Sequence, residues 1–197
     1  MRLGVGILAV VLSCLLLATS SVAYNKNLTP DDIRAAIEYG KSRRGKDIVD
    51  RDSPYFVGLD LYNFVVLSTP WLEVAWVARK AAGEYREPND NDIRSAVDSA
   101  TGRLEISGSL IQQIEGHFWE DFHAVIIQGA TTVQPLKKDG SFRSVVSCRS
   151  SPCAVQAGIL AIFPDENLNP VAPAEIIVIL QSGRKELRKT VDLATLR

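Results

Sequence analysis

The sequence contains few of the side chains that most often carry protein chemistry. Its 197 residues include two histidines, three cysteines and one methionine, and the formal net charge is -1. This balance argues against a nucleic-acid surface, which needs clustered basic side chains. The Gly-x-Ser-x-Gly pattern of hydrolase nucleophiles and the Cys-x-x-Cys spacing of thiol oxidoreductases are also absent from the sequence. We therefore expect no nucleic-acid partner and no cofactor.

The first 23 residues have the composition of a secretory signal peptide. Arg2 precedes an apolar run from Leu3 to Ala18, and the small residues Ser21-Val22-Ala23 predict cleavage before Tyr24. The alternative is an uncleaved membrane anchor, but the apolar run is shorter than the roughly 20 residues that a spanning helix needs. The expected location is secreted or periplasmic, with no stable membrane insertion after cleavage.

The cysteine count then predicts one disulfide. Cys14 lies within the apolar run of the predicted signal peptide, which leaves Cys148 and Cys153 in the exported chain. An even number of cysteines in an oxidising compartment favours a disulfide. Because a four-residue turn separates the two cysteines, we expect them to flank a hairpin and to stabilise it by about 2 kcal/mol.

Residues 24–101 are expected to be mainly helical. Thr29 and Thr69 each precede a proline, and Asn89 precedes an acidic turn, which are three typical helix starts. Residues 61–67, rich in β-formers, predict one short strand between the first two helices. The second helix is apolar nearly all round, so Trp71 and Trp76 are expected to pack in the core, although they could instead line a ligand pocket.

Residues 102–197 are expected to form an antiparallel β domain. Six strands are predicted, near residues 104–107, 122–127, 142–148, 154–163, 176–180 and 184–193. Residues 154–163 and 176–180 are apolar on both faces, which favours central strands covered on each side. Turns are expected at Lys138-Asp139-Gly140 and at Ser182-Gly183.

The predicted fold class is α+β, with N-terminal helices packed on a C-terminal antiparallel sheet of sandwich-like form. The composition changes near residues 100–102, which is the only plausible boundary in the exported chain. Residues 24–101 and 102–197 are therefore either two units or one continuous domain.

Both histidines lie in the stretch GHFWEDFHAVII, where Glu120 and Asp121 separate His117 from His123. In a helix the two histidines would lie about 240° apart around the axis, and in a strand roughly 20 Å apart, so neither geometry lets one ion join them. We therefore expect a strand entry that Phe118, Trp119 and Phe122 anchor in the core. A reactive site here would need partners from distant segments.

The function expected from these patterns is an exported, non-catalytic binding, scaffolding or envelope-associated module. Its partner would be a protein or another envelope component. The alternative is a secreted hydrolase or metal-dependent enzyme that uses His117, Glu120, Asp121 and His123.

The predicted processing can be checked by mass spectrometry. The intact mass of the exported protein under non-reducing conditions should equal that of residues 24–197 less two hydrogens, because cleavage precedes Tyr24 and one disulfide forms. A retained N-terminus would contradict the predicted cleavage, and two free thiols would contradict the predicted bond.

Overall fold

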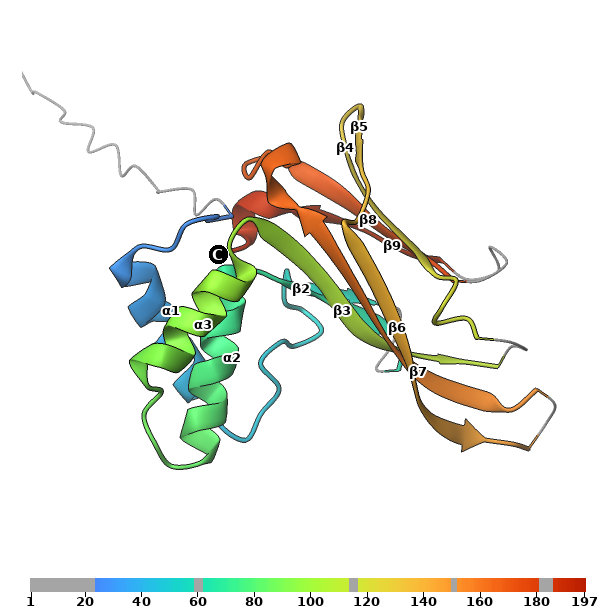
Figure 1. Ribbon diagram of the computed structural model, residues 1–197, viewed down its shortest axis with the longest axis horizontal. Helices are drawn as coiled ribbons and strands as arrows, with labels where there is room; N and C mark the ends of the chain where they lie inside the picture. Colours follow the sequence, from blue (N-terminus) through green and yellow to red (C-terminus); the bar gives the residue numbers. More distant parts are fainter. Residues whose placement is uncertain (1–23, 59–61, 114–116, 150–151, 181–185) are drawn as a thin grey trace, which may run out of the picture.

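The computed structural model describes residues 24–58, 62–113, 117–149, 152–180 and 186–197. Within these ranges it contains three α-helices and nine strands, arranged in two antiparallel sheets (Figure 1). The predicted signal peptide and the predicted Ser182-Gly183 turn lie outside the described residues. None of the helices found in the described ranges is long and apolar enough to cross a membrane.

Three side-chain caps begin the three helices at the residues expected from the sequence. The Thr29 hydroxyl accepts a hydrogen bond from the Asp32 amide at 3.2 Å, and the Asp32 carboxylate accepts one from the Thr29 amide at 2.9 Å. The Thr69 and Asn89 side chains cap the other two helices by accepting from the Leu72 and Asp92 amides. The helices are α1 (Pro30–Ser42), α2 (Pro70–Gly83) and α3 (Asp90–Ala100).

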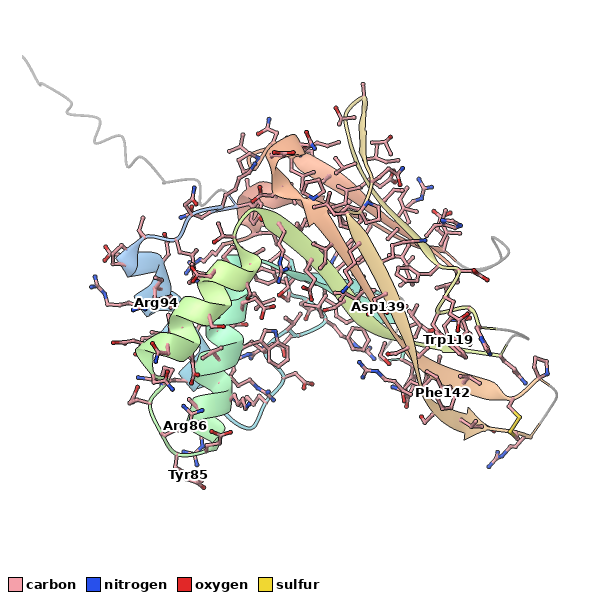
Figure 2. The ribbon with its side chains drawn as sticks, in the orientation of Figure 1. Tyr85, Arg86, Arg94, Trp119, Asp139 and Phe142 are labelled. Carbon is pink, nitrogen blue, oxygen red and sulfur yellow. A yellow bond between two sulfur atoms is a disulfide. The ribbon has the colours of Figure 1, made fainter. Side chains whose placement is uncertain are left out.

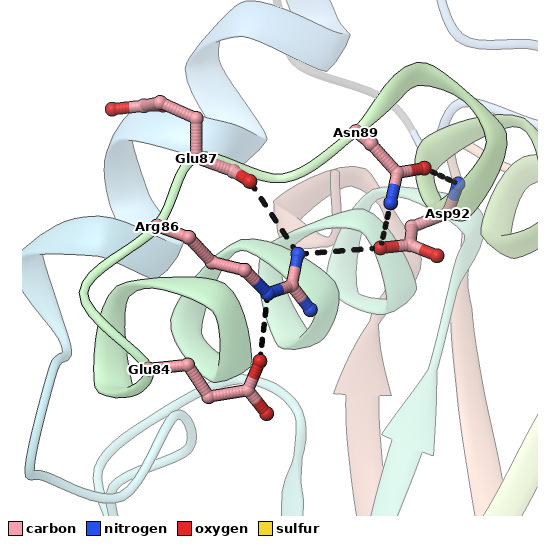
Figure 3. A network of polar contacts seen from close by, with 5 residues as sticks. All are labelled: Glu84, Arg86, Glu87, Asn89 and Asp92. Carbon is pink, nitrogen blue, oxygen red and sulfur yellow. Dashed lines mark hydrogen bonds and ion pairs between the residues drawn. The ribbon is translucent and has the colours of Figure 1, made fainter.

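A polar network holds the connection between α2 and α3 (Figure 3). The Arg86 side chain donates to the Glu84 carboxylate at 2.7 Å and to the Asp92 carboxylate at 3.5 Å. Asp92 also accepts a bond from the Asn89 amide group at 2.7 Å, so the network joins the loop to the first turn of α3. Its members are exposed, and exposed ion pairs of this kind contribute little to stability.

The first sheet has five strands in the order β1-β2-β3-β7-β6. Its strands are β1 (Phe56–Gly58), β2 (Phe64–Ser68), β3 (Arg103–Gln112), β7 (Ala154–Pro164) and β6 (Lys137–Ser147). The second sheet has four strands in the order β5-β4-β8-β9. Its strands are β5 (Thr131–Val133), β4 (His123–Gln128), β8 (Pro173–Ile179) and β9 (Glu186–Asp192).

Most of the buried apolar side chains of both sheets belong to one hydrophobic cluster, which the three helices also join. The alternation along β3 shows how this core is made: Leu104, Ile106 and Leu110 are fully buried, whereas Glu105 and Ser107 between them face the other way and are half-buried. The structure is therefore a mixed α+β protein, as the sequence predicts, with more strand than helix.

Strands from the first half of the chain lie in the same sheet as strands from the second half. The strand predicted at residues 61–67 appears as β2, which begins at Phe64 and pairs with β3. A second strand, β1, pairs with the other edge of β2. The five-stranded sheet therefore extends across the composition change near residues 100–102.

The two strands expected to be central are interior strands of their sheets. β7 lies between β3 and β6, and β8 lies between β4 and β9. For β7, however, the prediction of cover on both faces is wrong. Leu160 is half-buried and lines a groove, so the apolar residues on that face meet an open surface rather than a second layer.

The turn predicted at Lys138-Asp139-Gly140 is also wrong, because all three residues lie inside β6. Gly140 is required there by a close approach of another backbone. A Cβ atom at this position would lie 1.7 Å from the carbonyl oxygen of Trp119. A glycine inside a strand often marks such an approach rather than a turn.

This contact makes Gly140 a sensitive position. We expect Gly140→Ala to lower the free energy of unfolding by about 1–3 kcal/mol or more, because the Trp119 backbone must move to admit the new methyl group. Gly83→Ala is the matched control: no atom lies within 4 Å of its added Cβ, and alanine is the better helix former. Chemical denaturation of both variants measures the difference, and equal stabilities would contradict the close approach.

Candidate functional site

A groove of about 620 Å³ lies on the face of the five-stranded sheet that points away from the core. Strands β2, β3, β7 and β6 form its floor, and α2 stands at its side. Its polar and aromatic lining consists of Phe64, Ser68, Glu73, Trp76, Glu105, Ser107, Ser109, Asp139, Ser141 and Arg143.

The middle of the groove floor is formed by residues with small side chains. Ser109 on β3 lies opposite Gly158 on β7, which in turn lies opposite Ser141 on β6. The Ser109 hydroxyl accepts a hydrogen bond from the Gln156 side chain at 2.7 Å, so the neighbouring strand fixes its position. No large side chain rises from these three positions, but the Arg143 side chain from β6 lies over Gly158 and covers part of the row.

One wall of the groove comes from α2. Glu73 and Trp76 are three residues apart, so they share a face of the helix, and both line the groove. The Trp76 side chain is 38% exposed, whereas Trp71 is 4% exposed and packs against Tyr39 and Tyr55. Trp71 therefore packs in the core as expected, whereas Trp76 lines the groove.

Two carboxylates, those of Glu73 and Glu105, line the α2 side of the groove. Burial, together with the nearby charge of Glu73, raises the pKa of Glu105 above its ordinary value, while Arg103 and the Ser107 hydroxyl partly oppose this shift. The Ser68 hydroxyl donates a hydrogen bond to Glu73. This end of the groove is therefore acidic and rich in hydrogen-bond acceptors.

The opposite side of the groove carries Asp139 and Arg143 from β6. The Arg143 guanidinium lies over Gly158, where a Cβ atom would come within 2.8 Å of its Nε. Among the described residues, neither Asp139 nor Arg143 has a side-chain hydrogen bond or ion pair. Both groups are exposed and free to bind a ligand.

The histidine segment lies away from this groove lining. His117 and Glu120 come together, with Nδ1 and Oε1 2.9 Å apart, but both side chains are more than half exposed. His123 begins β4 and is exposed opposite Ile179. Asp121 is exposed as well. In the part of the chain that the structure describes, no three His, Cys, Asp or Glu side chains are grouped to hold a metal ion.

The aromatic residues of the same segment lie in the core, which fits a strand entry. Phe118 and Phe122 are almost fully buried, and Trp119 is 8% exposed. The Phe122 carbonyl accepts a hydrogen bond from Lys138 Nζ at 2.8 Å, which ties the segment to β6. Trp119 contacts Phe142 of the same strand (Figure 2).

Cys148 and Cys153 form the disulfide that the sequence predicts. The bond joins the residues that follow β6 to those that precede β7, at the tip of their hairpin (Figure 2). Their Cα atoms are 4.3 Å apart, close to the lower end of the usual range for disulfides.

The sequence patterns did not identify most of the groove residues. Glu73, Glu105, Asp139 and Arg143 are ordinary charged residues in sequence, and only the strand register brings them to one face. The signal that could have located the floor is the Ser107-Gly108-Ser109 run, because small residues inside a strand indicate a close approach.

No protein-family model, curated protein or solved structure matches this chain.

The electrostatics of the groove can be tested at Glu105. At pH 7 we expect Glu105→Gln to stabilise the fold by less than about 1 kcal/mol, because it removes a half-buried negative charge beside Glu73. Because the pKa of Glu105 is raised in the folded state, its negative charge destabilises the fold at high pH. This destabilisation disappears as Glu105 becomes protonated. In thermal unfolding, Glu105→Gln should therefore be more stable than the unmodified protein at pH 7, and this difference should vanish near pH 4.

Exposed Glu166 provides the control for this measurement, because it lies outside the groove lining. Glu166→Gln should show no comparable dependence on pH. An equal increase in the stability of Glu105→Gln at both pH values would contradict the repulsion between Glu73 and Glu105.

Proposed function

We propose that the protein is an exported, non-catalytic binding protein whose groove holds an elongated oligosaccharide of the cell envelope or its surroundings. The Cys148–Cys153 disulfide supports an oxidising compartment, such as the periplasm or the extracellular space. The observation that carries the proposal is the groove, which combines a floor of small hydroxyl side chains with an aromatic wall and charged groups at both sides.

Hydrogen-bonding chemistry favours a polyhydroxylated ligand. Sugar hydroxyls both donate and accept hydrogen bonds, and the groove offers both kinds of partner. Glu73, Glu105 and Asp139 accept, Arg143 donates, and the serine hydroxyls do either. A purely apolar ligand would leave these groups desolvated without partners, at a cost in affinity.

Aromatic contacts complete this match. Trp76 and Phe64 both line the groove, and their ring faces can pack against the apolar faces of sugar rings. Glu105 and Ser109 lie on the same strand four residues apart, so the floor is at least about 13 Å long. This length suits several sugar units in a row better than a single one.

The scaffold that we propose for this site is a β-sandwich. Its support is that the buried faces of the two antiparallel sheets share one hydrophobic cluster. In such a scaffold the outer face of the five-stranded sheet is left for binding, and α2 is placed at the end of β2.

The carboxylate pair in the groove favours one second candidate function, glycoside hydrolysis. Such enzymes use one carboxyl group with a raised pKa as the acid and a second, ionised carboxylate beside it. Glu105 and Glu73 are the corresponding pair here. Incubation with the bound oligosaccharide distinguishes the two functions, because shorter products that Glu105→Gln abolishes would indicate an enzyme.

Binding can be tested by isothermal titration calorimetry with short linear oligosaccharides of different sugar units. We expect micromolar to millimolar affinity for at least one of them, weakened about tenfold by Trp76→Ala because the ring contact is lost. Ser107→Leu should weaken it further, since the larger side chain would rise from the floor.

Tyr85→Ala is the matched control, because this aromatic side chain is 84% exposed on the loop after α2 and does not line the groove. It should bind like the unmodified protein. A tetralysine peptide tests the alternative that the acidic groove binds a cationic ligand. Binding of that peptide without any oligosaccharide, or no change in Trp76→Ala, would contradict the proposal.

A further inference from the structure

We infer that the hairpin of β6 and β7 is a docking arm for an anionic lipid surface. The arm consists of residues 142–149 and 152–156. Among the described residues it shares only Arg143 with the groove lining, and the inference does not rest on the oligosaccharide proposal.

The arm projects from the body of the molecule and is crosslinked near its end (Figure 1). Figure 1 shows the hairpin extending beyond the rest of the five-stranded sheet. The disulfide between Cys148 and Cys153 closes its tip (Figure 2). Among the described strands, β6 is the edge of its sheet and has a neighbour on one side only. The arm can therefore reach a surface that the body of the protein does not touch.

Large apolar side chains are concentrated on this arm. Phe142, Val145 and Val146 are 52%, 54% and 51% exposed, within five consecutive residues. Phe142 and Val145 lie opposite Ala157 and Val155 of β7, and Val146 lies at an irregularity in the pairing. A monomeric soluble protein has little reason to keep such a cluster in water unless it binds something.

The charge of the hairpin indicates what it binds. Residues 137–164 contain four basic side chains and one acidic one, although the whole chain has a formal net charge of -1. Of the basic residues, Arg143 and Arg149 belong to the arm, which has no acidic residue, whereas Lys137 and Lys138 lie at the opposite end of β6. Basic side chains around exposed apolar ones match the surface of an anionic bilayer, where lysine and arginine meet head groups and apolar groups enter the interface.

Two features of β6 argue against a second copy of the chain as the occupant. Its pairing with β7 is irregular between Phe142 and Ser144 and again between Val145 and Ser147. Irregular pairing and lysines on an edge strand both oppose edge-to-edge addition of another strand. Like charges on two arms would also repel each other. The arm is also only two strands wide at its tip, which offers a protein partner little area for a standard interface.

Flotation with lipid vesicles tests the inference on the disulfide-bonded exported protein. We expect binding to vesicles of equal parts phosphatidylglycerol and phosphatidylcholine, and much weaker binding to vesicles of phosphatidylcholine alone. Arg149→Gln should weaken binding about fivefold, and added salt should weaken it as well. The double variant Val145→Ser/Val146→Ser should weaken binding by at least about fivefold because it removes apolar groups from the interface.

Val171→Ser is the matched control, since Val171 is 57% exposed but lies in the connection before β8. It should bind vesicles like the unmodified protein. Because all the substituted side chains are exposed, the variants should keep the thermal stability of the parent. Equal binding to both kinds of vesicle, or to neither, would overturn the inference. A dimer by light scattering that Val145→Ser/Val146→Ser abolishes would instead identify a second copy as the occupant.

Discussion

The antiparallel pairing of β3 with β7 is the constraint on which the other features depend. Ten positions pair without interruption, from Arg103 opposite Pro164 to Gln112 opposite Val155. Since side chains alternate between faces, this register sends Leu104, Ile106 and Leu110 of β3 to the core and glutamate and serine of β3 to the groove. A slip by one residue would exchange the two sets and bury the Glu105 carboxylate, which makes the register strongly specified.

The attachment of α2 to the sheet determines where the groove has a wall. β2 ends at Ser68 and α2 begins at Pro70, so there is almost no free chain between them. Thr69 caps the helix and also donates a hydrogen bond to the carbonyl oxygen of Arg197 at 2.7 Å. The helix start is thereby held from both the sheet and the last residues of the chain. This fixes the direction in which Glu73 and Trp76 point.

Local patterns predicted the elements well, and long-range contacts account for the errors. Caps and prolines located the helix starts, and alternation located most of the strands, because both signals depend on neighbouring residues. The glycine in Lys138-Asp139-Gly140 was misread as a turn because the Trp119 backbone that requires it comes from a separate segment. The acidic pair of Glu73 and Glu105 was missed for the same reason, since 32 positions separate the two residues in sequence.

The position of the disulfide also affects how the hairpin can open. An edge strand held by a single neighbour normally frays from its free end, and its amide hydrogens exchange with solvent through such local openings. Here the crosslink joins the two strands at the turn, so separation cannot begin at the tip. Of the two ends of β6, only the one near Lys137 is left without a crosslink, and there Lys138 and Gly140 contact the aromatic segment that precedes β4. Local opening of β6 therefore depends on how that aromatic segment packs.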